Sequence, residues 1–277
     1  MTIHTHSHGH NSEHTHPGED SGRLMKVLGR IAHDGKTLSD YRSPRIVPAS
    51  NHVIVGTILA LLVGVVLAHL LPSNLADVGW IVVIAAIGHL AILVIGGLIV
   101  TLFVRYVRSR ARRTVIDSIP WHGAEMVLDV GCGTGMLLNG CAQKLTTGKA
   151  IGIDLWQQPV AGSPSVLMNN AKAEGVTDRV EYQEMDARHL TFEDERFNVV
   201  VSSFALHHIG TRREDREQAV TEMIRVLAPG GHLSLVDVGP MIDMADAVIA
   251  RAELELVHQR QTHFFHTVTA RKREATV

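Results

Sequence analysis

The second half of the sequence predicts an α/β fold with a seven-stranded, mostly parallel, doubly wound sheet. Three observations predict it. From residue 114 onward, short apolar strands alternate with amphipathic helices, a cluster of glycines follows the first strand, and acidic residues follow successive strands. This alternation is typical of a parallel sheet covered by helices on both faces. Before it, two uncharged apolar runs predict a transmembrane α-hairpin.

Each expected strand is a short apolar stretch bounded by turn residues. The last two are separated only by the polar residues QRQT, so we expect them to pair as a hairpin and to give the sheet one antiparallel edge strand. The seven strands are expected near residues 126–130, 149–153, 179–184, 197–202, 232–238, 253–258 and 263–269.

Helix ends between these strands carry recognisable signals. Ser163 followed by Pro164 predicts an N-cap with proline in the first turn. Thr211 with Glu214 predicts a capping box at the start of a later helix. The PGG sequence at 229–231 is expected to end that helix.

The front half contains two apolar runs, at residues 53–71 and 80–104, of 19 and 25 residues without a charge. As helices that rise about 1.5 Å per residue they would be roughly 28 and 37 Å long, so the first just spans a hydrocarbon core and the second must tilt or protrude. Ala60, Gly64 and Ala68 recur every four residues, which favours close packing of the two helices.

Arginines around the apolar runs predict their orientation. The connector at 72–79 has no Lys or Arg, whereas residues 105–113 contain five Arg. Because positive flanks stay on the cytoplasmic side, we expect a plasma (inner) membrane protein with both termini and the α/β domain in the cytoplasm. The expected segments are a His-rich disordered tail (1–20), an amphipathic or linker segment (21–52), a transmembrane hairpin (53–104), an Arg-rich juxtamembrane linker (105–113) and the α/β domain (114–277).

Charge and cysteine content narrow the function classes. Residues 1–113 carry 11 Lys and Arg against 6 Asp and Glu, a net charge of +5, whereas residues 114–277 carry 15 against 22, a net charge of −7. An acidic domain is a poor platform for phosphate backbones, so we do not expect a nucleic-acid partner. The two cysteines, Cys132 and Cys141, form no CxxC pair, which excludes a disulfide framework or a cysteine-based zinc site.

The glycine cluster lies in VLDVGCGTG, residues 127–135, directly after the first expected strand. Such a bend brings a ligand against bare backbone at the carboxyl edge of the sheet. A dinucleotide fingerprint requires GxGxxG, but the residue three after Gly133 is Met136, and no GxxxxGK[ST] phosphate loop is present. A dehydrogenase is therefore a weaker interpretation.

Acidic residues at three successive strand ends discriminate further. Asp154 ends the second expected strand, where a carboxylate can accept both hydroxyls of a ribose. Asp186 follows the third, where it can accept from an exocyclic adenine amine. A single such acid is more often a solvated strand end, but with Asp129 the sequence has three in order, which favours a nucleoside site.

The motifs VLDVGCGTG, GID, MDA, FNVVVSSFALHHI and RVLAPGGHLSLVDV resemble, in order and spacing, the class I S-adenosylmethionine-dependent methyltransferases of the small-molecule branch related to quinone methyltransferases. The resemblance covers about residues 114–270 and implies a Rossmann-like fold with S-adenosylmethionine as cofactor. Asn198 departs from it, since the family often has Asp there, but this position is expected outside the pocket.

The resemblance also implies roles for individual residues. The glycine bend would wrap the methionine and ribose parts of the cofactor, Asp129 would support the amino group, and Asp154 would hold the ribose. Asp186 with Ala187 would hold adenine. The implied cofactor-binding residues are Asp129, Gly131, Cys132, Gly133, Gly135, Asp154, Leu155, Asp186 and Ala187.

Methyl transfer from a sulfonium requires mainly that a nucleophile be held in line with the S–CH3 bond. If the nucleophile is a hydroxyl, a base is needed, and His207 and His208 follow the fourth expected strand where substrate would approach. They are the candidate catalytic residues, with shaping of the pocket as the alternative role.

The sequence thus predicts a membrane-anchored methyltransferase that acts on a small, apolar or lipid-like acceptor. The alternative is a non-catalytic sensor or scaffold that uses the six histidines of residues 1–16, where a divalent metal could bind. Deleting residues 1–20 separates the two, since unchanged methyl transfer counts against the metal interpretation. No residue is assigned to a fixed metal site, and the sequence contains no signal of oligomeric state.

Overall fold

The computed structural model describes residues 51–70, 72, 76–157, 162–252 and 254–274, with side chains described from Gly56 and, after the connector, from Asp77 onward. The predicted His-rich tail at 1–20 lies outside the described residues, as does most of the predicted segment at 21–52.

The two apolar runs form helices α2 (Asn51–Leu70) and α3 (Ala76–Asp117), which pack against each other. Small residues make the contact close: a Cβ at Gly79 would lie 2.2 Å from the Ala68 nitrogen, and one at Gly64 would lie 2.9 Å from Val83 Cγ2. By length and composition alone, one helix within the described part of the chain could cross a membrane, Asp77–Asp117, and Gly56–Leu70 is a shorter apolar helix.

Helix α3 continues without a break through residues 105–113, where the sequence predicts a linker. Its last turns pack against the α/β domain, with Ala111, Val115 and Ile116 buried in the same cluster as Val127 of the first strand. Ala111 and Val115, four residues apart, give these turns a buried face, so helix and domain share a core.

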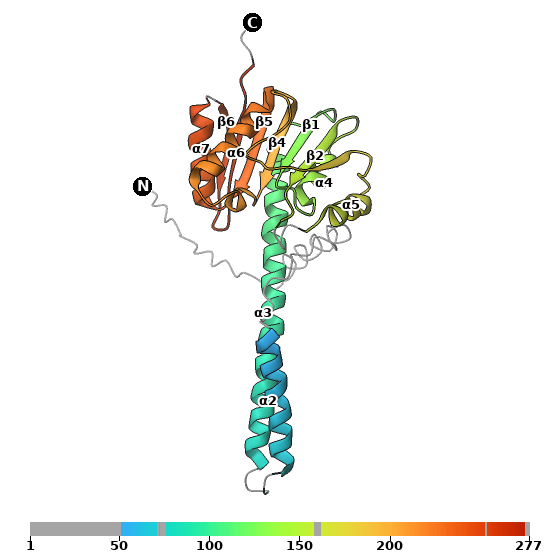
Figure 1. Ribbon diagram of the computed structural model, residues 1–277, viewed down its shortest axis with the longest axis vertical. Coiled ribbons are helices and arrows are strands. Elements are labelled where there is room, and N and C mark those ends of the chain that lie inside the picture. The colour runs from blue at the N-terminus through green and yellow to red at the C-terminus, as the bar shows by residue number, and fades with distance from the viewer. Residues whose placement is uncertain (1–50, 71, 73–75, 158–161, 253, 275–277) are drawn as a thin grey trace, which may run out of the picture. The chain divides into compact units, whose positions relative to one another are not determined.

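The sheet has the expected seven strands, in the order β3-β2-β1-β4-β5-β7-β6 (Figure 1). Strands β1 to β5 are parallel, and β7 is antiparallel to both β5 and β6, which confirms the predicted hairpin and the antiparallel edge. The predicted connector QRQT is wrong in its bounds, because QRQ belongs to β6 and the turn is formed by residues 262–265. The strands are β1 (Met126–Val130), β2 (Lys149–Asp154), β3 (Val180–Glu184), β4 (Phe197–Ser203), β5 (Leu227–Asp237), β6 (Glu255–Gln261) and β7 (His266–Arg271).

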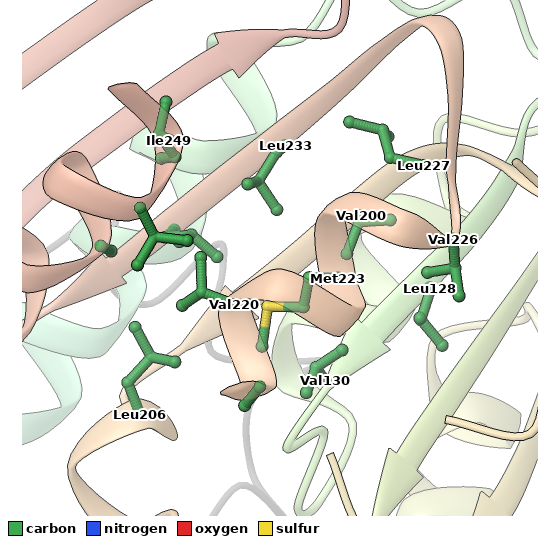
Figure 2. Packing of buried hydrophobic residues seen from close by; sticks show 14 of the residues in the cluster. Leu128, Val130, Val200, Leu206, Val220, Met223, Val226, Leu227, Leu233 and Ile249 are labelled. Carbon is green, nitrogen blue, oxygen red and sulfur yellow. The ribbon is translucent and has the colours of Figure 1, made fainter. Parts of the chain in front are cut away.

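Helices cover both faces of the sheet, as the alternation predicts. One face carries α6 (Arg213–Arg225) and α7 (Gly239–Arg251), and Figure 2 shows Val220 and Met223 of α6 beside sheet residues such as Val130 and Leu233. The other face carries the end of α3 with α4 (Met136–Ala142) and α5 (Pro164–Ala173). Alternate residues of β1 face the two clusters, since Leu128 belongs to the first and Val127 to the second.

Two predicted helix signals are wrong in detail. The strand β5 begins at Leu227, so the PGG at 229–231 lies inside it, where the pairing with β4 shifts register between Phe197 and Val199. Helix α6 is capped by Asp215, whose carboxylate accepts the Arg212 backbone N–H at 3.2 Å, rather than by Thr211 with Glu214. At the PGG, pairing with the neighbouring strand β4 extends β5 through the predicted stop. At the start of α6, Asp215 takes the capping role predicted for the adjacent Glu214. Ser163 does cap α5, accepting from the Val166 N–H at 3.4 Å.

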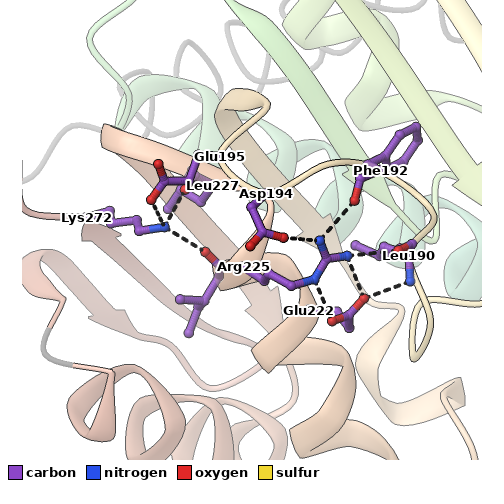
Figure 3. A network of polar contacts seen from close by, with 9 residues as sticks. Leu190, Phe192, Asp194, Glu195, Glu222, Arg225, Leu227 and Lys272 are labelled. Carbon is purple, nitrogen blue, oxygen red and sulfur yellow. Dashed lines mark hydrogen bonds and ion pairs between the residues drawn. The ribbon is translucent and has the colours of Figure 1, made fainter. Parts of the chain in front are cut away.

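Polar contacts centred on Arg225 hold the amino-terminal edge of the sheet (Figure 3). The guanidinium contacts Glu222 and Asp194 and donates to the carbonyl oxygens of Leu190 and Phe192. These contacts join the end of α6 to the loop before β4. This edge is opposite the strand ends at which the candidate site lies, so its role is structural.

Candidate active site

The strand order reverses between β1 and β4, and at their carboxyl ends lies a cavity of about 380 Å³. In open parallel sheets, ligands bind at such a reversal point. Eight of the nine predicted cofactor-binding residues line this one cavity: Asp129, Gly131, Cys132, Gly133, Asp154, Leu155, Asp186 and Ala187. The ninth, Gly135, is the N-cap of α4 and does not line it.

The glycines of the bend are required by the fold itself, in addition to leaving backbone open to a ligand. Gly131, Gly133 and Gly135 have φ angles of 76°, 52° and 83°, in the left-handed region that favours glycine. A Cβ at Gly131 would lie only 2.2 Å from the Ala205 Cβ. The bend is tied to β2 because the Gly131 and Cys132 N–H groups donate to Ile153 O at 2.8 and 3.0 Å.

Asp154 connects this bend to the loop after β2. Its carboxylate accepts the backbone N–H groups of Gly133 and Trp156, each at 2.9 Å, and the Trp156 indole donates to Gly133 O at 3.0 Å. Each carboxylate oxygen keeps further acceptor capacity. A half-buried carboxylate oriented in this way at a strand tip suits the two hydroxyls of a ribose.

Asp129 is the most unusual group in the cavity. It is 1% exposed, and neither carboxylate oxygen has a hydrogen-bond partner among the described residues. Its pKa is raised to about 8, mainly by burial; the Leu138 backbone N–H acts in the opposite direction, and the charge of the nearby Asp154 adds a smaller rise. A buried acid without a partner is costly unless a cation or donor reaches it, so Asp129 fits the amino group of a ligand.

Comparison with known proteins decides between nucleoside ligands. Residues 128–235 match the family model described as a methyltransferase domain. The chain carries a class I S-adenosylmethionine-dependent methyltransferase domain. S-adenosylmethionine is the cofactor of such domains. The buried Asp129, the strand-end Asp154 and the glycine bend all fit this ligand.

Similar proteins include methyltransferase GfsG of Streptomyces halstedii, which is 35% identical over 145 residues, 51% of this chain and 49% of that protein. The chloroplastic 2-phytyl-1,4-beta-naphthoquinone methyltransferase of Arabidopsis thaliana is 33% identical over 124 residues, 43% of this chain and 45% of that protein. The chain therefore spans about half the length of these relatives. The crystal structure of the [4+2]-cyclase SpnF has the same fold, with a TM-score of 0.50 at 19% identity over 60% of this chain and 82% of that one.

Asp186 of the methyltransferase domain is more constrained than the sequence suggests. Arg188 grips its carboxylate, with Nη2 at 2.6 Å from Oδ2 and Nε at 3.0 Å from Oδ1. These hydrogen bonds lower the pKa of Asp186, which therefore stays ionised. An adenine amine would share an oxygen with Arg188. Arg188 also lines the cavity, and sequence reasoning missed it although it stands two residues after the acid.

The two candidate catalytic histidines, in the short helix η1 (Leu206–His208), are placed differently in the methyltransferase domain. His208 lines the cavity. Its pKa is lowered, mainly by burial and to a smaller extent by the neighbouring His207, so the imidazole is neutral at pH 7. His207 is not among the lining residues, but its ring stacks on that of His208 with centroids 4.0 Å apart. Its Nδ1 lies 2.7 Å from Oδ1 of the fully buried Asp237.

Asp237 is a functional candidate that sequence reasoning missed. It ends β5, and its carboxylate also accepts the Val238 backbone N–H at 2.7 Å. With Nδ1–H donated to a carboxylate, a neutral His207 presents Nε2 as an acceptor. An acid at a fourth strand end, in SLVDV, was the available signal.

The cavity is also lined by residues that the sequence analysis did not single out. Arg108 reaches the cavity from α3, and burial lowers its pKa. Phe204, directly after β4, also lines it and has a φ of 52°, which is strained for a non-glycine residue. Asn198 lies outside the lining, as expected, and its Oδ1 accepts the Met126 N–H at 2.9 Å.

A metal site is not found in the described part of the chain, where no group of three or more His, Cys, Asp or Glu is placed to hold an ion. The histidines of residues 1–16, for which metal binding is an alternative, lie outside the described residues. The alternative therefore stays a prediction.

Proposed function

We propose that this protein is a membrane-anchored enzyme that transfers a methyl group from S-adenosylmethionine to a small, apolar or lipid-like acceptor. The observation that carries the proposal is the buried Asp129, whose carboxylate has no hydrogen-bond partner within the described part of the chain, in the same cavity as Asp154 and the glycine bend. Together these groups suit an amine, a ribose and a chain without phosphate. They do not suit a nucleotide phosphate, which would meet two carboxylates.

Support for an apolar acceptor comes from the cavity wall and from a relative. Met136, Met185, Phe204 and Ile209 line the cavity beside the polar groups. The Arabidopsis relative is by name a methyltransferase of a phytyl-naphthoquinone, a ring with a long hydrocarbon tail. We propose an acceptor of this general kind, with a polar head that reacts and an apolar remainder.

The anchor is proposed from α3 and the charges that follow it. The apolar part of α3 leads directly into a stretch with five arginines, which favours a cytoplasmic end at that side of an inner membrane. Helix α2, which precedes α3, would cross the same bilayer in the opposite direction, so both termini would lie in the cytoplasm. Tethering keeps the cavity within reach of acceptors that partition into lipid.

When bound, S-adenosylmethionine supplies a methyl carbon that is already electrophilic because it is attached to a sulfonium. The protein's task is then to orient the acceptor, exclude water and take up a proton if the nucleophile is a hydroxyl. His208 lines the cavity as a neutral imidazole, and the stacked His207 is oriented by Asp237. This arrangement gives the site a proton acceptor beside the methyl transfer.

The central experiment is to incubate membranes that contain the protein with methyl-labelled S-adenosylmethionine and to identify the labelled product. A labelled, lipid-extractable molecule that requires the intact protein is the expected result. Self-labelling of the protein, or no product in membranes from the source cell, would contradict the proposed activity.

Asp154→Ala is expected to weaken S-adenosylmethionine binding, measured by titration calorimetry on the full chain. Each hydrogen bond to a charged group contributes about 1.5–3 kcal/mol, so the Kd should rise roughly 10- to 100-fold or more. Asp178→Ala is the matched control, because that acid is exposed and outside the cavity. Equal affinity of wild type and Asp154→Ala would remove the ribose assignment.

Asp237→Asn is expected to lower kcat for the labelled acceptor by about tenfold or more with little change in KM, since a general base contributes roughly 10²–10⁴-fold. The reason is that an amide no longer selects the Nδ1–H tautomer of His207. Side-chain nitrogen NMR should show the change in tautomer directly. Asp243→Asn, an exposed acid on α7, is the control. A variant with altered tautomer but normal kcat would leave Asp237 a purely structural role.

A further inference from the structure

Four phenylalanines connect the apolar part of α3 with the cavity. Phe103 lies within the apolar run, and its ring meets that of Phe264 edge to face, with centroids 4.9 Å apart. The next residue, Phe265, is buried and meets Phe204 edge to face at 6.2 Å. Phe204 lines the cavity. We call these four residues the phenylalanine row.

The topology places Phe264 at the same edge of the sheet as the cavity. It belongs to the turn between β6 and β7, and His266, at the start of β7, is the register partner of Asp237 at the end of β5. The turn is held in shape by Thr262, whose N–H and hydroxyl both donate to Phe265 O, at 3.0 and 2.6 Å. Phe264 is therefore presented on a fixed turn at the carboxyl edge.

Helix α3 links this edge to the apolar run over a short distance. Arg108 lines the cavity four residues after Val104, where the run ends, and four residues of an unbroken helix rise about 6 Å. If the run lies in a bilayer, as the proposed function has it, the cavity wall begins about one helical turn from the end of the hydrocarbon region.

The exposed groups around this junction match a membrane interface. Phe264 is 52% exposed and Phe103 is 45% exposed, although they touch each other, and Tyr106 is exposed one turn further along. Exposed Arg110 follows on the same helix. Aromatic rings at the depth of the headgroups with basic side chains beyond them are typical of a cytoplasmic interface.

We propose that the carboxyl edge of the sheet docks on the bilayer through Phe264, and that the acceptor enters the cavity from the membrane with its hydrocarbon tail toward the exposed rings of Phe264 and Phe103. This inference rests on the membrane anchor of the proposed function. It defines the acceptor as an amphiphile whose reactive head lies at headgroup depth. A water-soluble acceptor would gain nothing from this arrangement.

The test measures the depth of single nitroxide labels in the full chain, reconstituted in vesicles of phosphatidylcholine and phosphatidylglycerol. The labelled variants are Phe264→Cys, Leu256→Cys and Ile92→Cys. The two native cysteines, Cys132 and Cys141, are buried, so a nitroxide reagent added to the folded protein reacts with the introduced cysteine. Collision of each label with oxygen, which concentrates in lipid, is compared with collision with a water-soluble nickel chelate.

Leu256 is the matched control because it is an equally exposed apolar residue of the same hairpin, 54% exposed, but stands near the start of β6 at the opposite edge of the sheet. We expect the label at 264 to collide with the chelate several-fold less, relative to oxygen, than the label at 256. Equal ratios at 264 and 256 would overturn the docking proposal.

Ile92, an exposed residue in the middle of the apolar run, separates this outcome from failure of the anchor. A lipid-like ratio at 92 with a water-like ratio at 264 refutes docking and leaves the anchor standing. Water-like ratios at both positions refute the anchor and docking together. A lipid-like ratio at 92 and an interfacial ratio at 264 support both.

Discussion

Gly131→Ala is expected to destabilise the methyltransferase domain by about 2–5 kcal/mol. An L-residue in the left-handed region costs roughly 1–2 kcal/mol, and overpacking costs roughly 1–3 kcal/mol more. The overpacking arises because the new methyl group would lie 2.2 Å from the Ala205 Cβ, so η1 would have to move away from β1. The measurement is the shift in the denaturation midpoint of the full chain in detergent.

Gly175→Ala is a matched control for this prediction. Gly175 also has a positive φ, 69°, but a Cβ there would meet nothing within 4 Å. The control therefore carries only the backbone cost, about 1–2 kcal/mol. A Gly131→Ala variant no less stable than Gly175→Ala would show that η1 moves freely. In that case the close approach of Ala205 would not shape the bend.

Asp129→Asn is expected to remove a pH dependence from cofactor binding. With a pKa of about 8, Asp129 is mostly protonated at pH 6.5. A bound ammonium group favours the ionised form, so binding to the wild type must release a proton. The affinity of the wild type should therefore rise up to about tenfold per pH unit toward pH 8, whereas the variant has no such group to titrate.

The measurement is the ratio of wild-type to variant Kd for S-adenosylmethionine between pH 6 and 8.5. Taking the ratio cancels titration of the ligand's own amine. At the upper end, the variant should bind more weakly by about 1.5–3 kcal/mol, which is the contribution of one charged hydrogen bond. A ratio that does not change with pH would exclude an amine partner for Asp129.

Stability provides a second readout of the same carboxyl group. Its pKa rises from an ordinary value of 3.8 to about 8 on folding, so the folded protein holds the proton more tightly than the unfolded chain. Relative to Asp129→Asn, the wild type should be most stable below pH 4. It should lose stability steadily as the pH rises to about 8 and no further above it. If the wild type instead gained stability relative to Asp129→Asn as the pH rises, burial could not be the cause of the raised pKa.

Much of the methyltransferase site was predictable because its signals are local. The glycine bend requires left-handed backbone at three glycines within five residues. The acids Asp129, Asp154 and Asp186 stand at or just after the carboxyl ends of three parallel strands. Parallel strands bring their carboxyl ends to one edge, so a list of strand ends is already a list of neighbours. Gly135 is the exception, since it caps α4 beside the cavity.

Signals failed where a distant partner replaced a local one. The PGG at 229–231 became part of β5 because Leu227 pairs with Phe197 and the register shift absorbs the glycines. The Arg-rich segment at 105–113 became helix because Ala111, with Val115 in the next turn, had a core to enter. Neither outcome can be read from a window of neighbouring residues, since each depends on which surface lies opposite.

By itself, the sequence determined the fold class, the order of the strands along the chain and many of the residues that line the candidate site, because glycine conformation and strand ends depend on near neighbours. Only the tertiary structure decided that Asp237 orients His207 and that Phe264 reaches Phe103. It also decided that the Asp129 carboxylate is buried without a hydrogen-bond partner in the part of the chain that the structure describes. The physical reason is that these features arise between elements far apart in the chain, and only the packing of sheet and helices brings them into contact or leaves them without one.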